Sequence, residues 1–470
     1  MLYKKETFAS SNGKNSFVDD RLASIFLCSH DKLQWYRWWI YDQVQSQPNQ
    51  LFSTLHGYDP KIDDSWIGSF STMWQEVSQY MTATASVSID EIVAHLLEFD
   101  ILELGSDPNA LIAAKNLIFA VIGWQTMLYQ ADMHSCPPEQ LAIQSQMGVH
   151  QGQAHMCLKQ NHSSCRRRMH EFLLGYGLLL PPRNFEGLGS VEDKKAFAEF
   201  KSVSSTSFNA SLLSSIGDVT IEWVDSLSCH MEFDPYLNKL FLFRYPSFCL
   251  ANIPADGSGH STKSAIYACA TPRDSAGQWA TTADVNQMLQ ETTLSYRLLF
   301  GQNKASRQLF QKSKPYACAT PRDSAGQWAT TADVTQMLQE TTLSYRLLFG
   351  QNKSSRQLFQ KSKPFENIPE AGRDTFLERL CGRKRYQSNY NSPERETYDL
   401  AHDFPILRSR LLPLLRHLSA KKPRTWRELW EDKRDSASWL TFWAVLVIGG
   451  MGLILAMLQT ILQIVQVIQH

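Results

Sequence analysis

The most constraining feature of this sequence is an uncharged run near its C-terminal end. From Ser436 to Gln469 the 470-residue chain carries no acidic or basic side chain. Within that run, residues 437–457 are dominated by Trp, Phe, Leu, Val, Ile, Ala and Gly. A helix rises about 1.5 Å per residue, so this stretch covers about 30 Å, the thickness of a bilayer's hydrocarbon core. The run predicts a single transmembrane helix over residues 436–467, with Trp439 and Trp443 at the headgroups.

The charge on either side of this run predicts its orientation. Residues 408–435 carry nine basic and four acidic side chains. The basic ones are Arg408, Arg410, Arg416, Lys421, Lys422, Arg424, Arg427, Lys433 and Arg434, and the acidic ones are Glu428, Glu431, Asp432 and Asp435. Basic flanks stay on the cytosolic side, so we expect the bulk of the chain in the cytosol, on an unspecified organelle. A lone span so near the end predicts a tail-anchored, single-pass membrane protein whose basic flank contacts the lipid bilayer.

The span has two internal patterns, each with two interpretations. Gly449, Gly450, Gly452 and Ala456 either let two helices approach closely or reflect the usual tolerance of membrane helices for glycine. Four glutamines form one stripe on a helix: Gln459, Gln463, Gln466 and Gln469. Their amides either hydrogen-bond between helices, or the segment emerges and lies in the interface. Homo-oligomerisation through the transmembrane helix is therefore one of the expectations.

Composition describes the remainder as a folded chain. Hydrophobic residues make up 43% and charged residues 20%, which suits a globular protein with a substantial core. The 46 basic residues balance the 46 acidic ones, so no net field draws the whole chain to nucleic acid, and nucleic acid is not an expected partner. Nine cysteines without a CxxC pair predict reduced thiols rather than a secreted disulfide framework.

Local patterns predict a mainly α fold with a small antiparallel β element (α+β) and the single C-terminal transmembrane helix. Helices are expected at 21–45, 89–99, 110–129 and 164–180, and strands only within 218–253. The predicted regions are a disordered N-terminus (1–18), an aromatic-rich helical segment (19–85), a helical domain (86–185), a small α+β region (186–266), two repeat copies (267–315 and 316–364), a charged linker with a basic juxtamembrane segment (365–435), and the transmembrane helix with its Gln-striped end (436–467).

Three of these helices carry particular expectations. Ser88 and Glu91 form a capping-box pattern at the start of 89–99. Asp107 and Pro108 predict an N-cap followed by an N1 proline, opening a buried central helix. The tryptophans at 35, 38 and 39 predict core packing against the helix around 66–80, the alternative being a patch that faces a partner or a membrane.

The middle of the chain is duplicated. Residues 267–315 and 316–364 agree at 47 of 49 positions and differ only as Asn286 against Thr335 and Ala305 against Ser354. Such near-identity indicates a recent duplication, for instance of an exon, or an error in how the gene's coding segments were assigned. Each copy predicts a helix, 281–300 and 330–349, closed by a C′ glycine at Gly301 or Gly350. In the first copy the apolar face is Val285, Met288, Leu289, Tyr296 and Leu299. We expect one place in the core for these two faces.

Two further stretches of the sequence are distinctive. One is the helix end 294–302, and the other comprises residues 426–430 with Asp435, Trp439, 441–444 and the glycine pair 449–450. In these two stretches the chain resembles a family of uncharacterised filamentous-fungal proteins. The similarity runs loosely from about residue 86 to the end, and this chain departs from it by carrying the 49-residue unit twice. The resemblance implies a C-terminal hydrophobic segment, and it implies no activity and no catalytic residue.

Histidine and cysteine concentrate between residues 134 and 170. The set is His134, Cys136, His150, His155, Cys157, His162, Cys165 and His170. Zinc takes four nitrogen or sulfur ligands, and His155, Cys157, His162 and Cys165 are the best-spaced candidates. The pairs are His-x-Cys and His-x2-Cys rather than CxxC, so scattered polar or core residues are the favoured interpretation, and no cofactor is expected.

Function is therefore predicted from anchoring rather than from chemistry. The sequence contains no Walker A loop, HExxH, GxSxG or kinase motif set, so no catalytic or cofactor-binding residue is assigned. The leading expectation is a membrane scaffold or regulatory interaction protein with an unidentified protein partner. The alternative is a metal-dependent or nucleic-acid-binding regulator using residues 134–182, where Arg166, Arg167 and Arg168 form a basic run that is otherwise a solvated face.

Overall fold

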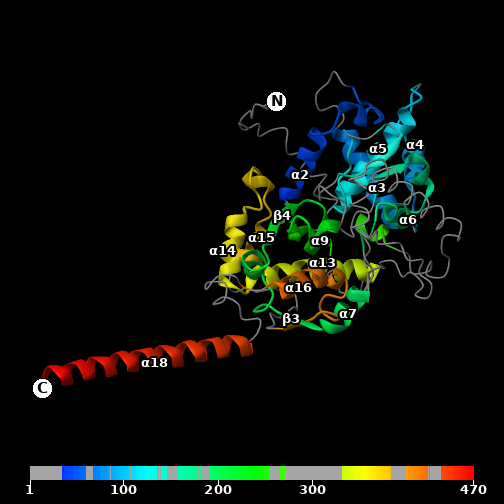
Figure 1. Cartoon of the computed structure of the whole chain (residues 1–470). Coiled ribbons are helices and arrows are strands. Elements are labelled where there is room, and N and C mark those ends of the chain that lie inside the picture. The colour runs from blue at the N-terminus through cyan, green and yellow to red at the C-terminus, as the bar shows by residue number, and fades with distance from the viewer. Residues whose placement is uncertain are drawn as a thin grey trace, which may run out of the picture.

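The computed structural model of the chain comprises a helical body and one long helix, α18, that projects from it (Figure 1). It describes residues 34–59, 67–84, 86–105, 107–134, 137, 139–144, 157–177, 179–180, 191–252, 264–270, 331–382, 397–421, 423 and 436–469. The fold class is mainly α, as predicted, with three small sheets. The predicted N-terminal segment 1–18 lies outside the described residues.

The N-terminal half is a group of helices built around one apolar helix. Its elements are α2 (Gln34–Gln45), η2 (Asn49–Phe52), α3 (Ile67–Ala83), α4 (Ile89–Glu98) and α5 (Ala110–Thr126). Every residue of α5 from Leu117 to Thr126 is buried, which confirms the predicted central helix. The predicted cap is wrong by two positions, because Asn109 rather than Asp107 is the N-cap. The Asp107 carboxylate instead accepts a hydrogen bond from the Asn109 backbone N–H at 2.8 Å.

The predicted capping box of α4 is confirmed. The Ser88 hydroxyl accepts a hydrogen bond from the Glu91 backbone N–H at 3.2 Å, and the Glu91 carboxylate accepts one from the Ser88 N–H at 2.8 Å. Two N–H groups that a helix start would otherwise leave without partners are thereby satisfied. The helix then lays Ile92 and Leu96 into the core beside α5.

The tryptophans of α2 are core residues, although their main neighbours differ from the predicted ones. Trp35 stacks on Tyr245 with ring centroids 4.1 Å apart, and its indole N–H donates to the Ser247 hydroxyl at 2.7 Å. The Trp38 indole ring packs against Gly372, where a Cβ would clash with the ring. Helix α2 therefore packs on segments more than 200 residues away, rather than chiefly on the helix that follows it.

Residues 139–177 hold less helix than predicted. Strands β1 (Gln140–Ala142) and β2 (Lys159–Asn161) pair antiparallel and are followed by η3 (His162–Arg166) and α6 (Met169–Leu174). The predicted helix 164–180 is wrong, because the backbone turns extended at Arg167 and α6 ends at Gly175. A Cβ at Gly175 would meet the Gln160 side chain, so this close approach favours glycine.

Strands also occur outside the predicted 218–253 segment. Strand β3 (Ser202–Ser204), which follows α7 (Val191–Glu199), pairs antiparallel with β7 (Thr397–Asp399). Within the predicted segment, α8 (Ala210–Ser215) leads to β4 (Thr220–Val224), η4 (Leu227–Cys229), β5 (Phe233–Asp234) and β6 (Lys239–Phe243). This sheet is mixed rather than antiparallel throughout, since β6 is antiparallel to β5 and parallel to β4.

The second repeat copy supplies the helix in the core. After α9 (Pro246–Asn252) and α10 (Ala265–Ala268) come α13 (Thr331–Tyr345), the π-helical turn η6 (Arg346–Gly350) and α14 (Lys353–Ser362). Its apolar face is buried at the positions equivalent to those predicted in the first copy: Val334, Met337, Leu338, Tyr345 and Leu348. Apart from residues 267–270, the first copy, including helix 281–300 and Gly301, lies outside the described residues.

Gly350 does not act as the predicted left-handed C′ cap. It is the last residue of η6 and has no positive φ. The Arg346 side chain lies where a Cβ of residue 350 would be, and it donates to the Leu380 carbonyl at 2.7 Å. The glycine is thus explained by space for a buried guanidinium rather than by helix termination.

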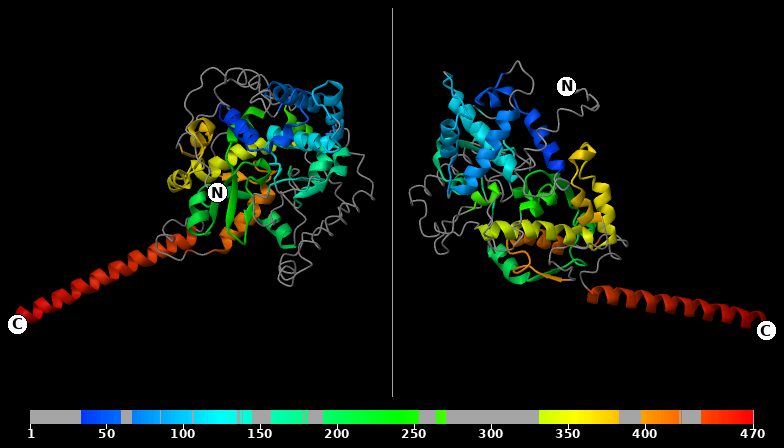
Figure 2. Two further views of the ribbon diagram at one scale, coloured as in Figure 1. Left: turned by 90° about the horizontal axis from the view of Figure 1, so that it is seen from above. Right: turned by 180° about the vertical axis from the view of Figure 1, so that it is seen from behind.

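Much of the predicted charged linker is folded. The segment contains η7 (Glu370–Gly372), α15 (Thr375–Gly382), β7 and α16 (Arg408–Ala420). Leu377, Leu380, Leu411 and Leu414 are buried, so 365–382 and 397–421 belong to the body rather than to a linker. Figure 2 shows that α18 (Ser436–Gln469) is the element that extends away from this body in both views.

Candidate functional site

Helix α18 is the most unusual surface of the protein. Its 34 residues form one continuous helix, of which 443–464 is long and apolar enough to cross a membrane. None of this stretch is buried: the exposed fraction is 71% at Ile448 and 69% at Leu453. Burying one such side chain gains about 1.5–3 kcal/mol, so a run of them in water is strongly unfavourable. The described body therefore leaves the apolar side chains of this helix uncovered.

Three of the four zinc candidates are described: Cys157 lies just before β2, and His162 and Cys165 both lie in η3. His155 lies outside the described residues, as do Cys136 and His150. Cys157 donates from Sγ to the Lys159 carbonyl at 3.0 Å, and His162 Nε2 lies 3.1 Å from Asn116 Oδ1. Cys165 is fully buried. Among the residues that the structure describes, no three His, Cys, Asp or Glu side chains gather as a metal site would require.

The protonation of these groups follows from burial. Burial raises the pKa of the Cys165 thiol to about 12, so the side chain is a neutral thiol that packs as an apolar group. Burial also lowers the pKa of His162, with the Lys115 ammonium acting in the same direction. Zinc binds thiolates, so Cys165 would have to lose a proton that its surroundings retain. The zinc prediction remains open, because His155 is not described.

The basic run at 166–168 lies at the surface beside a buried apolar face. Arg166 and Arg168 are exposed, whereas Phe172 and Leu173 of α6 point into the core. The run thus precedes the six-residue helix α6, whose buried face packs in the core. This placement agrees with a solvated charged face.

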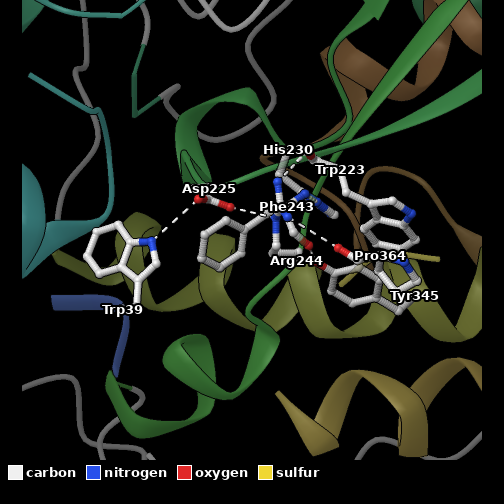
Figure 3. Close-up of polar contacts among 8 residues, drawn as sticks. All are labelled: Trp39, Trp223, Asp225, His230, Phe243, Arg244, Tyr345 and Pro364. Carbon is white, nitrogen blue, oxygen red and sulfur yellow. Dashed lines mark hydrogen bonds and ion pairs between the residues drawn. The ribbon is translucent and has the colours of Figure 1, made fainter. Parts of the chain in front are cut away.

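A polar cluster that the sequence did not reveal lies between the mixed sheet and α2 (Figure 3). The Asp225 carboxylate is 2.6 Å from Arg244 Nε and accepts a hydrogen bond from Trp39 Nε1 at 3.4 Å. The guanidinium also donates to the carbonyls of Trp223, at 2.9 Å, and Pro364, at 3.3 Å. Arg244, which lies between β6 and α9, thus connects its own segment to the end of β4 and to the end of the second repeat copy.

His230 is the centre of a second, fully buried network in the same view (Figure 3). Its Nδ1 accepts a hydrogen bond from the Phe243 N–H at 3.3 Å, and its Nε2 lies 2.8 Å from Ser344 Oγ. The backbone donor fixes the tautomer, so Nε2 carries the hydrogen and donates to the serine. Tyr345 donates to the Phe243 carbonyl alongside. Burial, helped by the Arg410 charge, lowers the pKa of His230 to about 3, so the ring is neutral.

The histidine–serine pair does not have the arrangement of a catalytic dyad. A general base must accept the serine proton at Nε2, but here Nε2 is already the donor. The Ser344 hydroxyl in turn donates to the Thr341 carbonyl at 2.8 Å. Both side chains are fully buried. The network therefore joins α13 to the sheet and gives the pair a structural role.

Three buried charged side chains, Arg410, Glu232 and Glu340, hold α16 against this network. Arg410 Nε is 3.0 Å from Glu232 Oε1, the two side chains being 2% and 5% exposed, and Arg410 Nη1 donates to the His230 carbonyl at 2.7 Å. Glu340 of α13 accepts hydrogen bonds from the backbone N–H groups of Ile406, at 3.0 Å, and Leu407, at 2.7 Å. A carboxylate is favourable there because the first N–H groups of a helix carry partial positive charge.

The sequence contained one clue to these charges. Arg408 and Arg410 interrupt an otherwise apolar stretch, and by position they belong to the basic residues that flank the predicted span. In the structure Arg408 lies over the Phe197 ring, 3.7 Å from its centroid, and donates to the Phe197 carbonyl at 2.5 Å. Arginines inside an apolar helical pattern are better interpreted as buried partners of a distant carboxylate or carbonyl.

No family model, curated protein or solved structure matches this chain. The resemblance to filamentous-fungal proteins therefore remains a prediction.

Proposed function

We propose that this protein is a membrane-anchored interaction or scaffold protein, held to the bilayer by α18 and presenting the helical body to a protein partner. One observation carries the proposal: a 22-residue apolar stretch, 443–464, with no buried side chain. At about 1.5 Å per residue the stretch is about 33 Å long, slightly more than the hydrocarbon thickness. No other helix among the described residues meets this requirement.

The contrast with the body supports the proposal. The body buries its own apolar side chains in one extended core, so it requires no lipid to fold. Its buried polar groups at His230, Ser344, Arg410 and Glu232 are used to join elements to one another. A body of this kind is suited to holding a fixed surface near a membrane, and the chemistry at its centre supports stability rather than turnover.

The proposed orientation depends on the basic residues near the span that are not buried in the body. With Arg408 and Arg410 assigned to the core, residues 416–435 still contain seven basic and four acidic side chains. The excess of positive charge next to the span favours a cytosolic body. The same residues would attract anionic lipid headgroups, at about 1 kcal/mol for each basic side chain near the surface.

Alkaline carbonate extraction of membranes from cells expressing the full chain tests the anchor. The wild-type protein is expected in the pellet. The variant Leu453→Lys/Ile454→Lys should be released, because each lysine at the centre of the span costs about 2.5–3.5 kcal/mol. Tyr236→Lys/Leu237→Lys is the matched control, since it adds the same charge at exposed apolar positions of the body. Wild-type protein in the supernatant, or equal retention of all three chains, would refute the proposal.

Glycosylation reports the orientation, and the structure selects the informative asparagine. Asn161 is exposed, whereas Asn209 is fully buried and caps α8, so a glycan at Asn209 is incompatible with the folded body. Asn352 caps α14. We expect an acceptor site added after His470 to be used and Asn161 to stay unmodified. Glycan on Asn161 would reverse the orientation and leave the anchor itself intact.

A further inference from the structure

The polar and small residues of α18 lie on one seam. Gly449, Gly452, Ala456, Gln459, Gln463 and Gln466 follow one another at spacings of 3, 4, 3, 4 and 3 residues. This alternation keeps positions on the contact face of two helices that cross at a small left-handed angle. The seam residues are all exposed, and nothing in the described structure lies within 4 Å of a Cβ built at Gly449 or Gly452.

The two halves of the seam differ in chemistry, but both favour contact with another helix. In the first half the small residues allow backbones to approach closely. In the second half each side chain is an amide, which has both donors and an acceptor. Gln459 and Gln463 lie within the apolar stretch 443–464, where lipid offers them no hydrogen-bond partner. Amides in such a position are satisfied by another protein helix.

We infer that α18 pairs with the α18 of a second copy of this chain along the seam 449/452/456/459/463/466. The inference rests on the proposed membrane anchoring. Chains inserted with one orientation are parallel, so each seam residue meets its own equivalent across the pair. An amide can donate to and accept from an identical amide, and two glycines leave the least space between backbones. A second copy therefore fits the whole seam, whereas an unrelated helix would need matching amides at three positions.

The other faces of α18 provide the internal comparison. Ile454 and Ile461 lie opposite the seam and are exposed and purely apolar. They suit contact with lipid chains, which are as apolar as leucine and give no preference for a protein partner. Gly450 lies one residue off the seam, so it is a small residue that the inferred contact does not use.

The test uses the full chain carrying two different epitope tags, co-expressed and solubilised in mild detergent. Capture of one tag should recover the other. Gln459→Leu/Gln463→Leu/Gln466→Leu should lower the recovery about tenfold or more, since each interhelical hydrogen bond in lipid contributes a factor of about three. Gly452→Leu should also lower it, while Gly450→Leu should not. Unchanged recovery for the triple variant, or equal loss from the two glycine variants, would overturn the inferred seam.

A cysteine pair maps the same contact inside the membrane. Oxidation of membranes carrying Gln463→Cys should give a disulfide-linked dimer in excess of the wild-type background, whereas Ile461→Cys, on the opposite face, should not. Equal cross-linking at both positions would also overturn the seam. Carbonate extraction of the same samples separates the two hypotheses. Retained chains that never associate refute the pairing alone, and chains that are not retained refute the anchor.

Discussion

Two apolar helices of this protein, α5 and α18, have opposite surroundings. Helix α5 is buried along 117–126, and α18 has no buried residue along 443–464. Their polar residues differ in the same way. Gln125 of α5 donates to the Trp74 carbonyl at 2.8 Å, and Lys115 reaches Asp90 at 2.8 Å, so α5 has partners in the body. Gln459, Gln463 and Gln466 of α18 are exposed.

The difference teaches that apolar composition alone does not specify the environment of a helix. Length is one deciding factor, since the 17 residues of α5 cover about 25 Å and the 34 of α18 about 51 Å. The second factor is the location of partners for the polar side chains. For α5 they lie on neighbouring helices and loops of the same chain, whereas for α18 we infer that they lie on another copy.

The largest expected effect comes from placing one charge in each helix. Ile118→Asp puts an unpaired carboxylate in a fully buried position, at a cost of several kcal/mol, comparable with the stability of a whole domain. The body should not fold, as judged by yield and near-ultraviolet circular dichroism. Ile454→Asp should leave the body's melting temperature unchanged in detergent and weaken only membrane retention. Ile118→Val is the control, with an expected loss of about 1 kcal/mol. A folded Ile118→Asp body would contradict the comparison.

Helix α13 sharpens the comparison because it is a buried helix with a second copy in the sequence. Leu338→Asp would place a charge in the core, where residue 338 is fully buried. The first copy can substitute, since its two differences are mild: Thr335 contributes a hydroxyl 3.1 Å from the Tyr267 hydroxyl, and Ser354 uses only its backbone N–H in the cap of α14. If the first copy replaced the second in the core, 49 residues of connecting chain would follow the core helices instead of preceding them. Such a change costs little, because each doubling of loop length adds only about 0.6 kcal/mol to the free energy of loop closure.

We therefore expect Leu338→Asp alone to lower the melting temperature slightly and Leu289→Asp alone to have no effect. The double variant should unfold, which thermal denaturation in detergent would show. If Leu338→Asp alone were as damaging as the pair, the first copy could not replace the second.

The pH dependence of unfolding should belong to the body, because residues 436–469 contain no titratable side chain. The pKa of His230 is lowered to about 3 in the folded body, so below pH 6.5 the unfolded chain takes up a proton that the folded one does not. Stability is therefore lost as pH falls from 6.5 towards 3, by about 2 kcal/mol at pH 5. His230→Gln, which can keep both hydrogen bonds, should flatten this part of the stability curve.

Asp374 acts in the opposite direction and serves as the control. Burial raises its pKa from 3.8 to about 6, so the folded body takes up a proton first and gains stability as pH falls from 6 towards 4. Asp374→Asn should steepen the acid loss. Denaturant titrations at pH 7, 6 and 5 measure both slopes, and identical slopes in the two variants would rule out these assignments.

The smallest expected effect is at the capping box beside α5. Ser88→Ala removes the acceptor for the Glu91 N–H and should cost about 1 kcal/mol, because α4 must then begin with one more unsatisfied donor. Ser419→Ala is the matched control, since that hydroxyl only returns to the Arg416 carbonyl at an exposed helix end. Chemical denaturation of both variants should separate them. Equal stabilities would mean that water replaces the cap at no cost.

The parts of the fold that the sequence predicted correctly depend on neighbouring residues. The capping box spans four residues, the burial of α5 follows from an unbroken apolar stretch, and the length of α18 follows from an uncharged run. The parts that it missed depend on distant partners. Strands β3 and β7 pair residues 202–204 with 397–399, and each is only three residues long. No local pattern reveals such a pairing.

The candidate sites follow the same division. The candidate membrane helix was visible because its chemistry lies in one continuous segment. The Arg410–Glu232 pair was not, because its partners are 178 positions apart and arginine beside a predicted span resembles a lipid-facing charge. The choice of the second repeat copy was equally out of reach, since 47 of 49 positions are the same in both copies.

The contact between Tyr267 and Thr335 has a genetic consequence. Sixty residues separate Ala270 from Thr331, yet α10 and α13 touch through those two hydroxyls. Removing one 49-residue unit would leave eleven residues, which reach up to about 36 Å and are ample for neighbouring ends. Unequal crossing-over between the two copies therefore changes the length of the gene without a penalty in folding. Alleles with one copy or three are expected to encode the same body.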